Sequence, residues 1–204
     1  MRIVALTAND GAVIERVARL LVAEFRELWP DAWPTLDDAL REVGESFAED
    51  RLSRVALDDD GTVLGWIGGI RQYDGHVWEV HPLVVAGELQ GGGIGRALVE
   101  DLELQVREQG ALTLWVGTDD ESDQTSLAGA DLYDDLPSKI ATIRNLRRHP
   151  YEFYQRCGFA IVGVMPDANG IGKPDIYMAK RVAGSPSMAG AIIDATRAVR
   201  TPPR

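Results

Sequence analysis

The chain has 204 residues, enough for one domain with a sizeable core, and its 45% hydrophobic and 26% charged content is typical of globular proteins. Its 21 Lys and Arg residues against 32 Asp and Glu give a net charge of −11, which argues against nucleic-acid and anionic-membrane binding and favours cationic partners. The single cysteine, Cys157, cannot form an intramolecular disulfide, and we find neither a metal-binding His/Cys cluster nor a secretory signal. We therefore expect a cytoplasmic protein without a bound metal.

The first part of the chain is predicted to form a short strand, Arg2–Leu6, and then a helix that ends at Trp29-Pro30. Asn9 or Asp10 is expected to cap that helix, because short polar side chains accept hydrogen bonds from its first free amides. Apolar residues recur every three or four positions along the helix, which predicts one buried face: Ile14, Val17, Leu21, Phe25 and Leu28.

A second helix and a β-hairpin are expected next. The helix begins near Thr35, whose hydroxyl forms a capping pair with Asp38. The hairpin joins Arg54–Leu57 to Val63–Ile70 through an Asp-Asp-Asp-Gly turn, because both runs are rich in strand-forming residues and are bounded by turn formers.

The strand predicted at Val77–Val85 contains Pro82, which cannot donate a hydrogen bond to a neighbouring strand. We therefore expect a bulge, or a parting of two strands, at this point. A glycine-rich loop, a helix from Ile94 to Gly110 and a strand at Leu112–Val116 complete a βαβ unit.

Residues 117–148 form a polar segment that is longer than a plain connection. We expect it to be an insertion on the substrate side of a single domain that spans residues 1–183. One helix and two strands are expected after it: Tyr151–Arg156, Phe159–Val164 and Asp175–Lys180. Residues 184–204 are predicted to be a flexible C-terminal tail.

The sequence Leu-Gln-Gly-Gly-Gly-Ile-Gly-Arg at 89–96 combines backbone freedom with the start of a helix. Glycines leave amide N–H groups unobstructed and the helix dipole adds partial positive charge, so this loop is suited to bind phosphate. Its spacing matches neither the GKS or GKT end of a nucleoside triphosphate loop nor the GxGxxG dinucleotide pattern. A flexible turn without a ligand is the alternative.

The motif Gln90-x-x-Gly93-x-Gly95 resembles the Arg/Gln-x-x-Gly-x-Gly/Ala signature of the GNAT superfamily of N-acetyltransferases. The run YEFYQRCGF at 151–159 is similar to the late helix of the same superfamily. The resemblance implies the α/β GNAT fold, in which a mixed, mostly antiparallel sheet is splayed between its fourth and fifth strands and has helices on both faces. It implies acetyl-CoA as the acetyl donor, held by the splayed strand, the loop and a tyrosine of the late helix: Leu83, Val84, Val85, Gln90, Gly91, Gly92, Gly93, Ile94, Gly95, Arg96 and Tyr154.

Acetyl transfer to an amine requires a neutral amine, a polarised carbonyl and a proton for the leaving thiolate. An alkyl ammonium with a pKa near ~10.4 must lose its proton before it attacks. His81 on the splayed strand is the first candidate for the base, and Glu79, which projects from the same face, is its rival. The alternative, that His81 has only a structural role in shaping the bulge, has equal weight. The resemblance assigns polarisation of the acetyl carbonyl to the backbone N–H of Val85.

Tyr154 matches the tyrosine with which the family protonates or hydrogen-bonds the sulfur of coenzyme A. An ordinary core tyrosine is the alternative. The family's asparagine upstream of this tyrosine is not clearly present, because Asn145 lies too far back in the sequence. Cys157 is expected to pack in the protein and not to act as a nucleophile.

Two acidic segments favour a cationic acceptor. Trp29 and Trp33 are interleaved with carboxylates, and Asp119 and Asp120 end a strand beside the splay. Indole rings can cover a sugar ring while carboxylates pair with its ammonium groups, although a solvated acidic surface is the alternative for most of these residues. Residues 10–183 are similar to bacterial aminoglycoside 6′-N-acetyltransferases, which implies substrate contacts from Trp29, Trp33, Glu79, Asp119 and Asp120.

The resemblance thus predicts direct acetylation of the 6′-amine of an aminoglycoside in a ternary complex, which gives aminoglycoside resistance. One alternative is a GNAT acetyltransferase of a polyamine or of a peptide or protein amine. Another is a module that binds coenzyme A without turnover. The expected partner is a small cationic amine, with no nucleic acid and no membrane, and a homodimer is left open.

Overall fold

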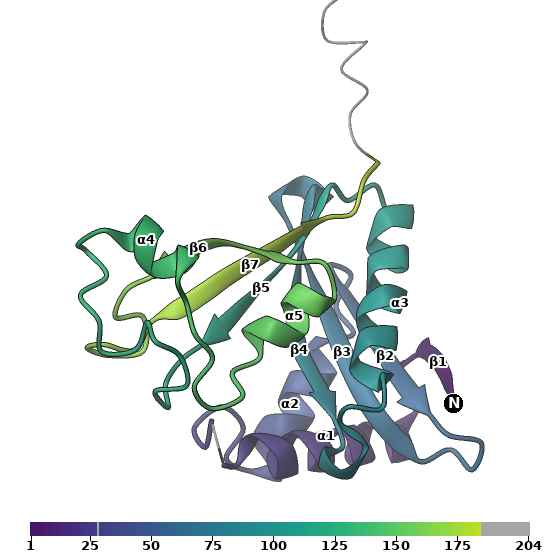
Figure 1. Cartoon of the computed structure of the whole chain (residues 1–204). Coiled ribbons are helices and arrows are strands. Elements are labelled where there is room, and N and C mark those ends of the chain that lie inside the picture. The colour runs from purple at the N-terminus through teal and green to yellow at the C-terminus, as the bar shows by residue number, and fades with distance from the viewer. Residues whose placement is uncertain (28, 185–204) are drawn as a thin grey trace, which may run out of the picture.

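A sheet of seven strands in the order β1-β2-β3-β4-β5-β7-β6 forms the centre of the molecule (Figure 1). The structure is a computed structural model that describes residues 1–27 and 29–184. Its strands are β1 (Arg2–Ala5), β2 (Arg51–Leu57), β3 (Val63–Gln72), β4 (Val77–Val85), β5 (Thr113–Asp119), β6 (Ala160–Met165) and β7 (Asp175–Arg181). Neighbouring strands are antiparallel except β4 and β5, which are parallel, so the predicted mixed, mostly antiparallel sheet is confirmed.

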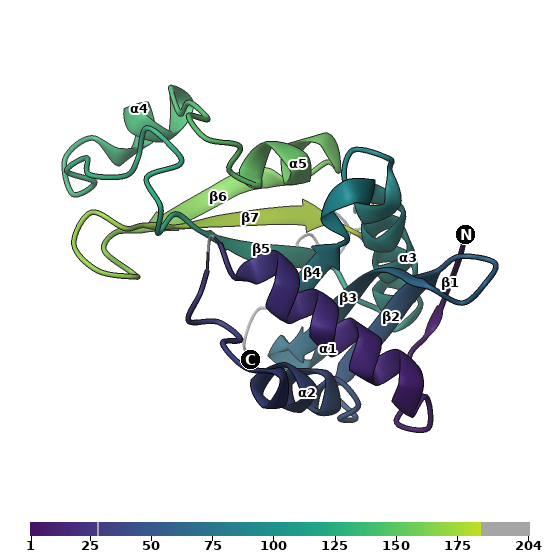
Figure 2. The same cartoon turned by 90° about the horizontal axis from the view of Figure 1, so that it is seen from below.

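Helices cover both faces of this sheet (Figure 2). They are α1 (Gly11–Phe25), α2 (Leu36–Glu45), α3 (Ile94–Glu108), α4 (Leu136–Ala141) and α5 (Tyr151–Arg156), with short 3₁₀ turns η1 (Tyr73–Gly75) and η2 (Gly87–Leu89). One core cluster includes Leu98 and Leu102 of α3 with Trp78 of β4. The other includes Leu21 of α1 and Trp66 of β3. Each face of the sheet is therefore stabilised by its own apolar layer.

Most predicted elements occur, with shifts of a few residues at their ends, but one predicted cap is wrong. Asp10 precedes α1, yet its carboxylate accepts hydrogen bonds from the N–H and the hydroxyl of Thr7, at 3.0 and 2.7 Å, and from no helical amide. A local turn therefore competes with the cap for this side chain. The Thr35 hydroxyl does cap α2, by accepting a hydrogen bond from the Asp38 N–H. The predictions for Leu28 and for the tail beyond Gly184 lie outside the described residues.

The predicted insertion is folded and lies at the opposite end of the sheet from α3 (Figures 1 and 2). β5 continues to Asp119, beyond its expected end, and α5 begins at Tyr151. Between them, Thr125 and Asn145 form an isolated β-bridge, and Leu127 joins the core cluster on the α3 side of the sheet. The segment is therefore attached to the domain by both hydrogen bonds and apolar packing.

Neither a membrane span nor a metal cluster is found in the part of the chain that the structure describes. No helix there is long and apolar enough to cross a membrane. Within the same residues, no group of three or more His, Cys, Asp or Glu side chains could hold a metal ion.

Candidate active site

The glycine-rich loop presents backbone N–H groups at the start of α3. Gly91 and Gly93 have φ angles of +81° and +91°, a region that suits glycine, and Gly93 caps α3 without a side chain. Gly91, Gly92 and Gly93 are exposed to solvent. In this loop the Gly92 N–H donates to the Leu89 carbonyl oxygen. The other backbone N–H groups of the loop and of the first helical turn have no acceptor among the described residues; they belong to Gly91, Gly93, Ile94, Gly95 and Arg96. Such unpaired amides at a helix N-terminus can bind an anion.

Gly95 allows α5 to pack against this first turn. A Cβ atom at Gly95 would lie 3.2 Å from the ring of Phe153, so a larger residue would push the two helices apart. The exposed Arg96 adds a positive charge beside the free amides. The first turn of α3 is therefore held in place by packing while its amides stay open.

β4 contains a bulge at the predicted position. His81 and Pro82 both lie opposite the single residue Gly68 of β3. A Cβ atom at Gly68 would lie only 2.2 Å from the His81 carbonyl oxygen, so no other residue fits there without a shift of the backbone. The bulge that Pro82 predicted is thus confirmed, and Gly68 makes room for it.

The bulge reverses the face to which alternate residues of β4 point. Before it, Trp78 packs in the cluster under α3, so Glu79 and His81 face the opposite side of the sheet. After it, Leu83 and Val85 pack on the α3 side. The odd-numbered residues of β4 therefore face away from α3 before the bulge and toward it after the bulge.

Beyond the bulge, β4 pairs with no other described strand on its β5 side. The two strands pair only over Val77–Glu79 and then part (Figure 1). The Ala86 N–H donates to the Leu64 carbonyl oxygen at 3.1 Å. Bonded and non-bonded pairs alternate along an antiparallel ladder, so the N–H groups of Leu83 and Val85 point away from β3 and into the gap. The gap thus offers two backbone donors.

Two residues predicted to contact acetyl-CoA, Gln90 and Val84, have side chains that contact other residues of the protein. The Gln90 Nε2 atom donates to the Val85 carbonyl oxygen at 3.2 Å. Val84 is 4% exposed and packs with Trp66 on the α1 side, and its backbone pairs with β3. Val84 therefore lies outside the gap, and we leave it out of the proposed contacts.

Glu79 belongs to a hydrogen-bonded chain on the face away from α3. The Gln72 Nε2 atom donates to Glu79 Oε2 at 2.6 Å, and the Trp115 Nε1 atom donates to Gln72 Oε1 at 3.0 Å. Trp115 meets the ring of Tyr177 edge-on, with centroids 5.7 Å apart. Burial raises the pKa of Glu79, although the charge of His81 and the bond from Gln72 oppose the shift. Glu79 is therefore a better proton acceptor than a surface glutamate.

His81 lies on the same face and remains open to solvent, with 43% of its side chain exposed. Its Nε2 atom is 3.8 Å from Glu42 Oε1 of α2. The second oxygen of Glu42 accepts a hydrogen bond from the Trp33 Nε1 atom at 3.4 Å, and the Trp33 and His81 rings lie 6.3 Å apart. Glu42 thus links the candidate base to the predicted aromatic wall.

Carboxylates from several segments meet on this side. Asp119 of β5 and Asp175 of β7 are direct partners in the strand register. Burial, followed by the charges of Asp119 and Glu79, raises the pKa of Asp175 to about 7, and its buried Oδ1 atom has no hydrogen-bond partner among the residues that the structure describes. Burial, Asp119 and Asp31 raise the pKa of Glu121. The two acidic segments predicted from the sequence therefore act on each other across this face.

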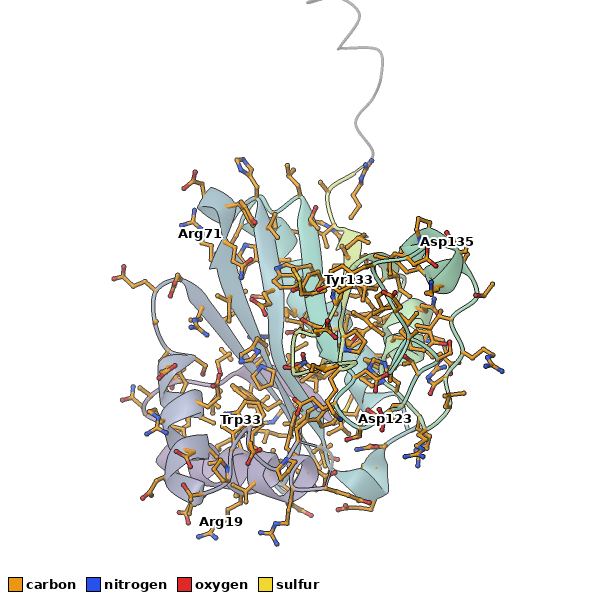
Figure 3. The ribbon with its side chains drawn as sticks, turned by 90° about the vertical axis from the view of Figure 1, so that its left-hand side faces the viewer. Arg19, Trp33, Arg71, Asp123, Tyr133 and Asp135 are labelled. Atoms are coloured by element: carbon orange, nitrogen blue, oxygen red, sulfur yellow. The ribbon has the colours of Figure 1, made fainter. Side chains whose placement is uncertain are left out.

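The aromatic wall is built at the end of α1. The Phe25 ring lies 5.5 Å from Trp29 and 4.7 Å from Trp33. Figure 3 looks onto this side, with Trp33 near α1 and α2, and with Asp123 and Tyr133 in the insertion. A hollow of about 300 Å³ adjoins Trp33 and is lined by Asp31, Ala32, Trp33, Pro34, Asp38, Arg41, Glu42 and Glu45. A cation would meet both indole and carboxylate groups here.

Asp120 has a structural role and does not reach this face. It is 0% exposed, and its two oxygens accept hydrogen bonds from the N–H groups of Gln124 and Thr125, at 2.6 and 2.8 Å. The buried His149 lies nearby; burial lowers its pKa, and the Asp120 charge opposes the shift. The Asn145 amide is bonded to both backbone groups of His149, at 2.8 Å each. We therefore remove Asp120 from the predicted substrate contacts.

Tyr154 of α5 lies in the core beside the first turn of α3. It is 6% exposed and packs edge-on between the rings of Phe153 and Phe159. Burial strongly raises the pKa of its hydroxyl, which therefore keeps its proton. Burial also raises the pKa of Cys157, although the charges of Arg96 and Lys180 oppose the shift. The side chain therefore stays protonated, which agrees with the predicted packing role and not with a nucleophile.

The structure adds residues that sequence reasoning missed: Gln72, Trp115, Asp175, Tyr177 and Glu42. The strand residues could have been found, because Trp115 and Asp119 are four positions apart on β5, and Asp175 and Tyr177 are two apart on β7. Glu42 gives no such signal, because it is one of several carboxylates on α2 and only packing selects it.

Comparison with known proteins agrees with this geometry. The Acetyltransferase (GNAT) family matches residues 14–128. A solved aminoglycoside 6′-N-acetyltransferase complexed with coenzyme A is 40% identical, with a TM-score of 0.85 over 92% of this chain and 100% of that enzyme. The aminoglycoside 6′-N-acetyltransferase from Enterococcus faecium is also 40% identical, with a TM-score of 0.82 over 92% and 100% of the two chains. Aminoglycoside 6′-acetyltransferase type Ii is 34% identical, with a TM-score of 0.69 over 91% and 100%.

No protein with a curated description matches the chain. The family match nevertheless extends over more than half of the residues, and it includes β4, the glycine-rich loop and α3. The protein therefore belongs to the GNAT family of acetyltransferases.

Proposed function

We propose that this protein transfers an acetyl group from acetyl-CoA to the 6′-amine of aminoglycosides and so gives resistance to them. The observation on which the proposal rests is that free backbone donors and an acidic, aromatic face meet at the gap between β4 and β5. The similarity to solved aminoglycoside 6′-N-acetyltransferases supports the choice of acceptor.

The donor side fits acetyl-CoA. Amides of the loop and the first turn of α3, with Arg96 beside them, suit its diphosphate. The N–H groups of Leu83 and Val85 suit the pantetheine arm and the acetyl carbonyl. When bound, acetyl-CoA supplies an acyl group activated as a thioester.

The protein contributes proton transfer and polarisation. His81 Nε2 takes a proton from the acceptor ammonium, and the nearby Glu42 carboxylate stabilises the resulting imidazolium. Glu79 is the alternative base, because burial makes it more basic than an exposed glutamate. The Val85 N–H polarises the carbonyl, and the protonated Tyr154 hydroxyl donates to the leaving sulfur.

The acceptor side suits a polycationic ring. We propose contacts from Trp29, Trp33, Glu79 and Asp119, joined by Asp175 of β7. Indole faces cover sugar rings, and the carboxylates pair with ammonium groups. The same carboxylates would also accept a polyamine, which is the second candidate, but a linear acceptor would leave the indole wall unused.

Thiol release from acetyl-CoA tests the proposal. We expect release with kanamycin or tobramycin, and none with an aminoglycoside that has a 6′-hydroxyl group in place of the amine. If thiol is released with spermidine and with no aminoglycoside, the acceptor is a polyamine. If the protein binds acetyl-CoA but releases no thiol with any amine, the alternative of a module that binds coenzyme A without turnover is favoured. The homodimer and the cytoplasmic location stay predictions.

A further inference from the structure

Glu24 of α1 bonds to the connection between β4 and the glycine-rich loop, although it is far from both in the sequence. Its Oε1 atom accepts a hydrogen bond from the Gly87 N–H at 2.9 Å. Its Oε2 atom lies 3.5 Å from Gln90 Nε2. A helix on the opposite side of the sheet from α3 thus holds the residues that lead into α3.

The Gln90 side chain extends this link to the strand. Its Nε2 atom also donates to the Val85 carbonyl oxygen at 3.2 Å. An amide can present either its NH₂ group or its oxygen, but a carboxylate and a carbonyl can only accept. Glu24 and Val85 therefore both select the orientation in which Nε2 faces them.

Gly87 permits the close approach of the carboxylate. A Cβ atom at Gly87 would lie 3.1 Å from Glu24 Oε2 and 3.3 Å from Oε1. The neighbouring backbone bonds of this turn, from Leu89 to Ala86 and from Gln90 to Gly87, are short local ones. The carboxylate of Glu24 is thus a long-range anchor for Gly87 and Gln90, which lie beyond the last bond to β3, donated by the Ala86 N–H to the Leu64 carbonyl oxygen.

We propose that Glu24 is a positioning residue of the donor site, which fixes the glycine-rich loop relative to the end of β4. The inference rests on the proposed function, because acetyl-CoA is the ligand that would use both groups of amides. With the anchor in place, the loop amides and the Val85 N–H keep one relative arrangement, so little order has to be gained on binding.

The sign of the effect separates positioning from simple charge. A carboxylate near a diphosphate site repels the ligand, so its removal by charge alone would strengthen binding. Loss of an anchor would weaken binding instead. A residue with a general structural role would lower thermal stability and would affect both substrates alike.

The test measures the Kd of coenzyme A by calorimetry for the wild type, Glu24→Ala and Glu24→Gln. We expect about tenfold weaker binding for Glu24→Ala, as for loss of a hydrogen bond to a charged group. Glu24→Gln keeps an acceptor for Gly87 and should lose about threefold. Glu15→Ala is the matched control, because Glu15 lies on the same helix and its carboxylate bonds to the exposed Arg19, far from the glycine-rich loop in the sequence. The KM of the acceptor should not change.

Coupling to Gln90 gives a second readout. Gln90→Ala should weaken coenzyme A binding, and adding it to Glu24→Ala should cost less than the sum of the two. A Kd for Glu24→Ala that is within twofold of the wild type, or tighter, would overturn the inference. A wild type that does not bind coenzyme A would instead refute the proposed function, so the two failures are distinguishable.

Discussion

The side of the candidate site that would bind the acetyl donor and the side that would bind the amine acceptor use different chemical groups. On the donor side the functional groups are backbone N–H groups, which come from the end of β4 and from the adjoining loop and helix. On the acceptor side they are side chains from β4, β5, β7, α2 and the connection between α1 and α2. Backbone donors persist when side chains change. The acceptor preference can therefore vary while the use of the donor is kept.

Loss of the base is the largest effect expected, and it should fall on the acceptor side alone. His81→Ala should lower kcat by roughly 100-fold or more, the usual scale for a general base. The Kd of coenzyme A should not change, because His81 faces away from the α3 side. Steady-state kinetics with calorimetry would measure both. If kcat stays near the wild-type value and Glu79→Gln is inactive, Glu79 is the base.

The adjacent residues Asp119 and Asp120 allow a substrate-binding carboxylate to be compared with a structural one. Asp119→Asn should raise the KM of an aminoglycoside about tenfold, because one carboxylate of the acidic face is lost. Asp120→Asn should instead lower the free energy of unfolding by about 2 kcal/mol, since an amide hydrogen would face a buried donor. Kinetics and urea unfolding distinguish them. A stable Asp120→Asn protein with a raised KM would reverse our assignment.

A backbone substitution should affect the donor side only. Gly93→Ala places a side chain at a φ of +91°, which costs about 1 kcal/mol. We expect the Kd of coenzyme A to rise about fivefold while the KM of the acceptor is kept. Gly44→Ala is the control, because this glycine of α2 has open space around its Cβ position and no positive φ. An equal change in the two substrates would break the separation of the two sides.

The smallest effect expected is a pH dependence from Asp175, whose pKa is raised to about 7. A cationic acceptor pairs with the ionised carboxylate, so its KM should fall about threefold between about pH 6 and pH 8. The effect on stability has the opposite direction. The folded state holds this proton more tightly than the unfolded state, so the contribution to stability is lost as pH rises from about 4 to 7.

Asp175→Asn should remove both parts of that dependence. The acceptor amines titrate as well, but equally for both proteins, so the comparison isolates Asp175. Identical pH profiles of KM and of melting temperature in the two proteins would rule out the role.

The fold and the donor loop could be predicted because their signals are local. Strand and helix periodicities, the glycine loop and Pro82 each depend on a few neighbouring residues, and the sheet, α3 and the bulge follow from them. The cap at Asp10 failed for the same reason, since an equally local turn with Thr7 competes for its carboxylate.

The acceptor side could be predicted only in outline. Sequence identified two acidic segments but could not tell Asp119 from its neighbour Asp120, because burial depends on the fold of the whole insertion. Glu24 and Glu42 were missed for a related reason. Each is one carboxylate among several on a helix, and only tertiary contacts give it a specific partner.

The bulge opposite Gly68 limits how the length of β4 can change. Removing one residue between Pro82 and Val85 would keep the bulge but shift the end of the strand by one position, which turns its side chains to the opposite face of the sheet. Val85 would then leave the layer beneath α3 and project toward the carboxylates. Relatives of this protein should consequently tolerate many replacements along this strand but few single-residue deletions.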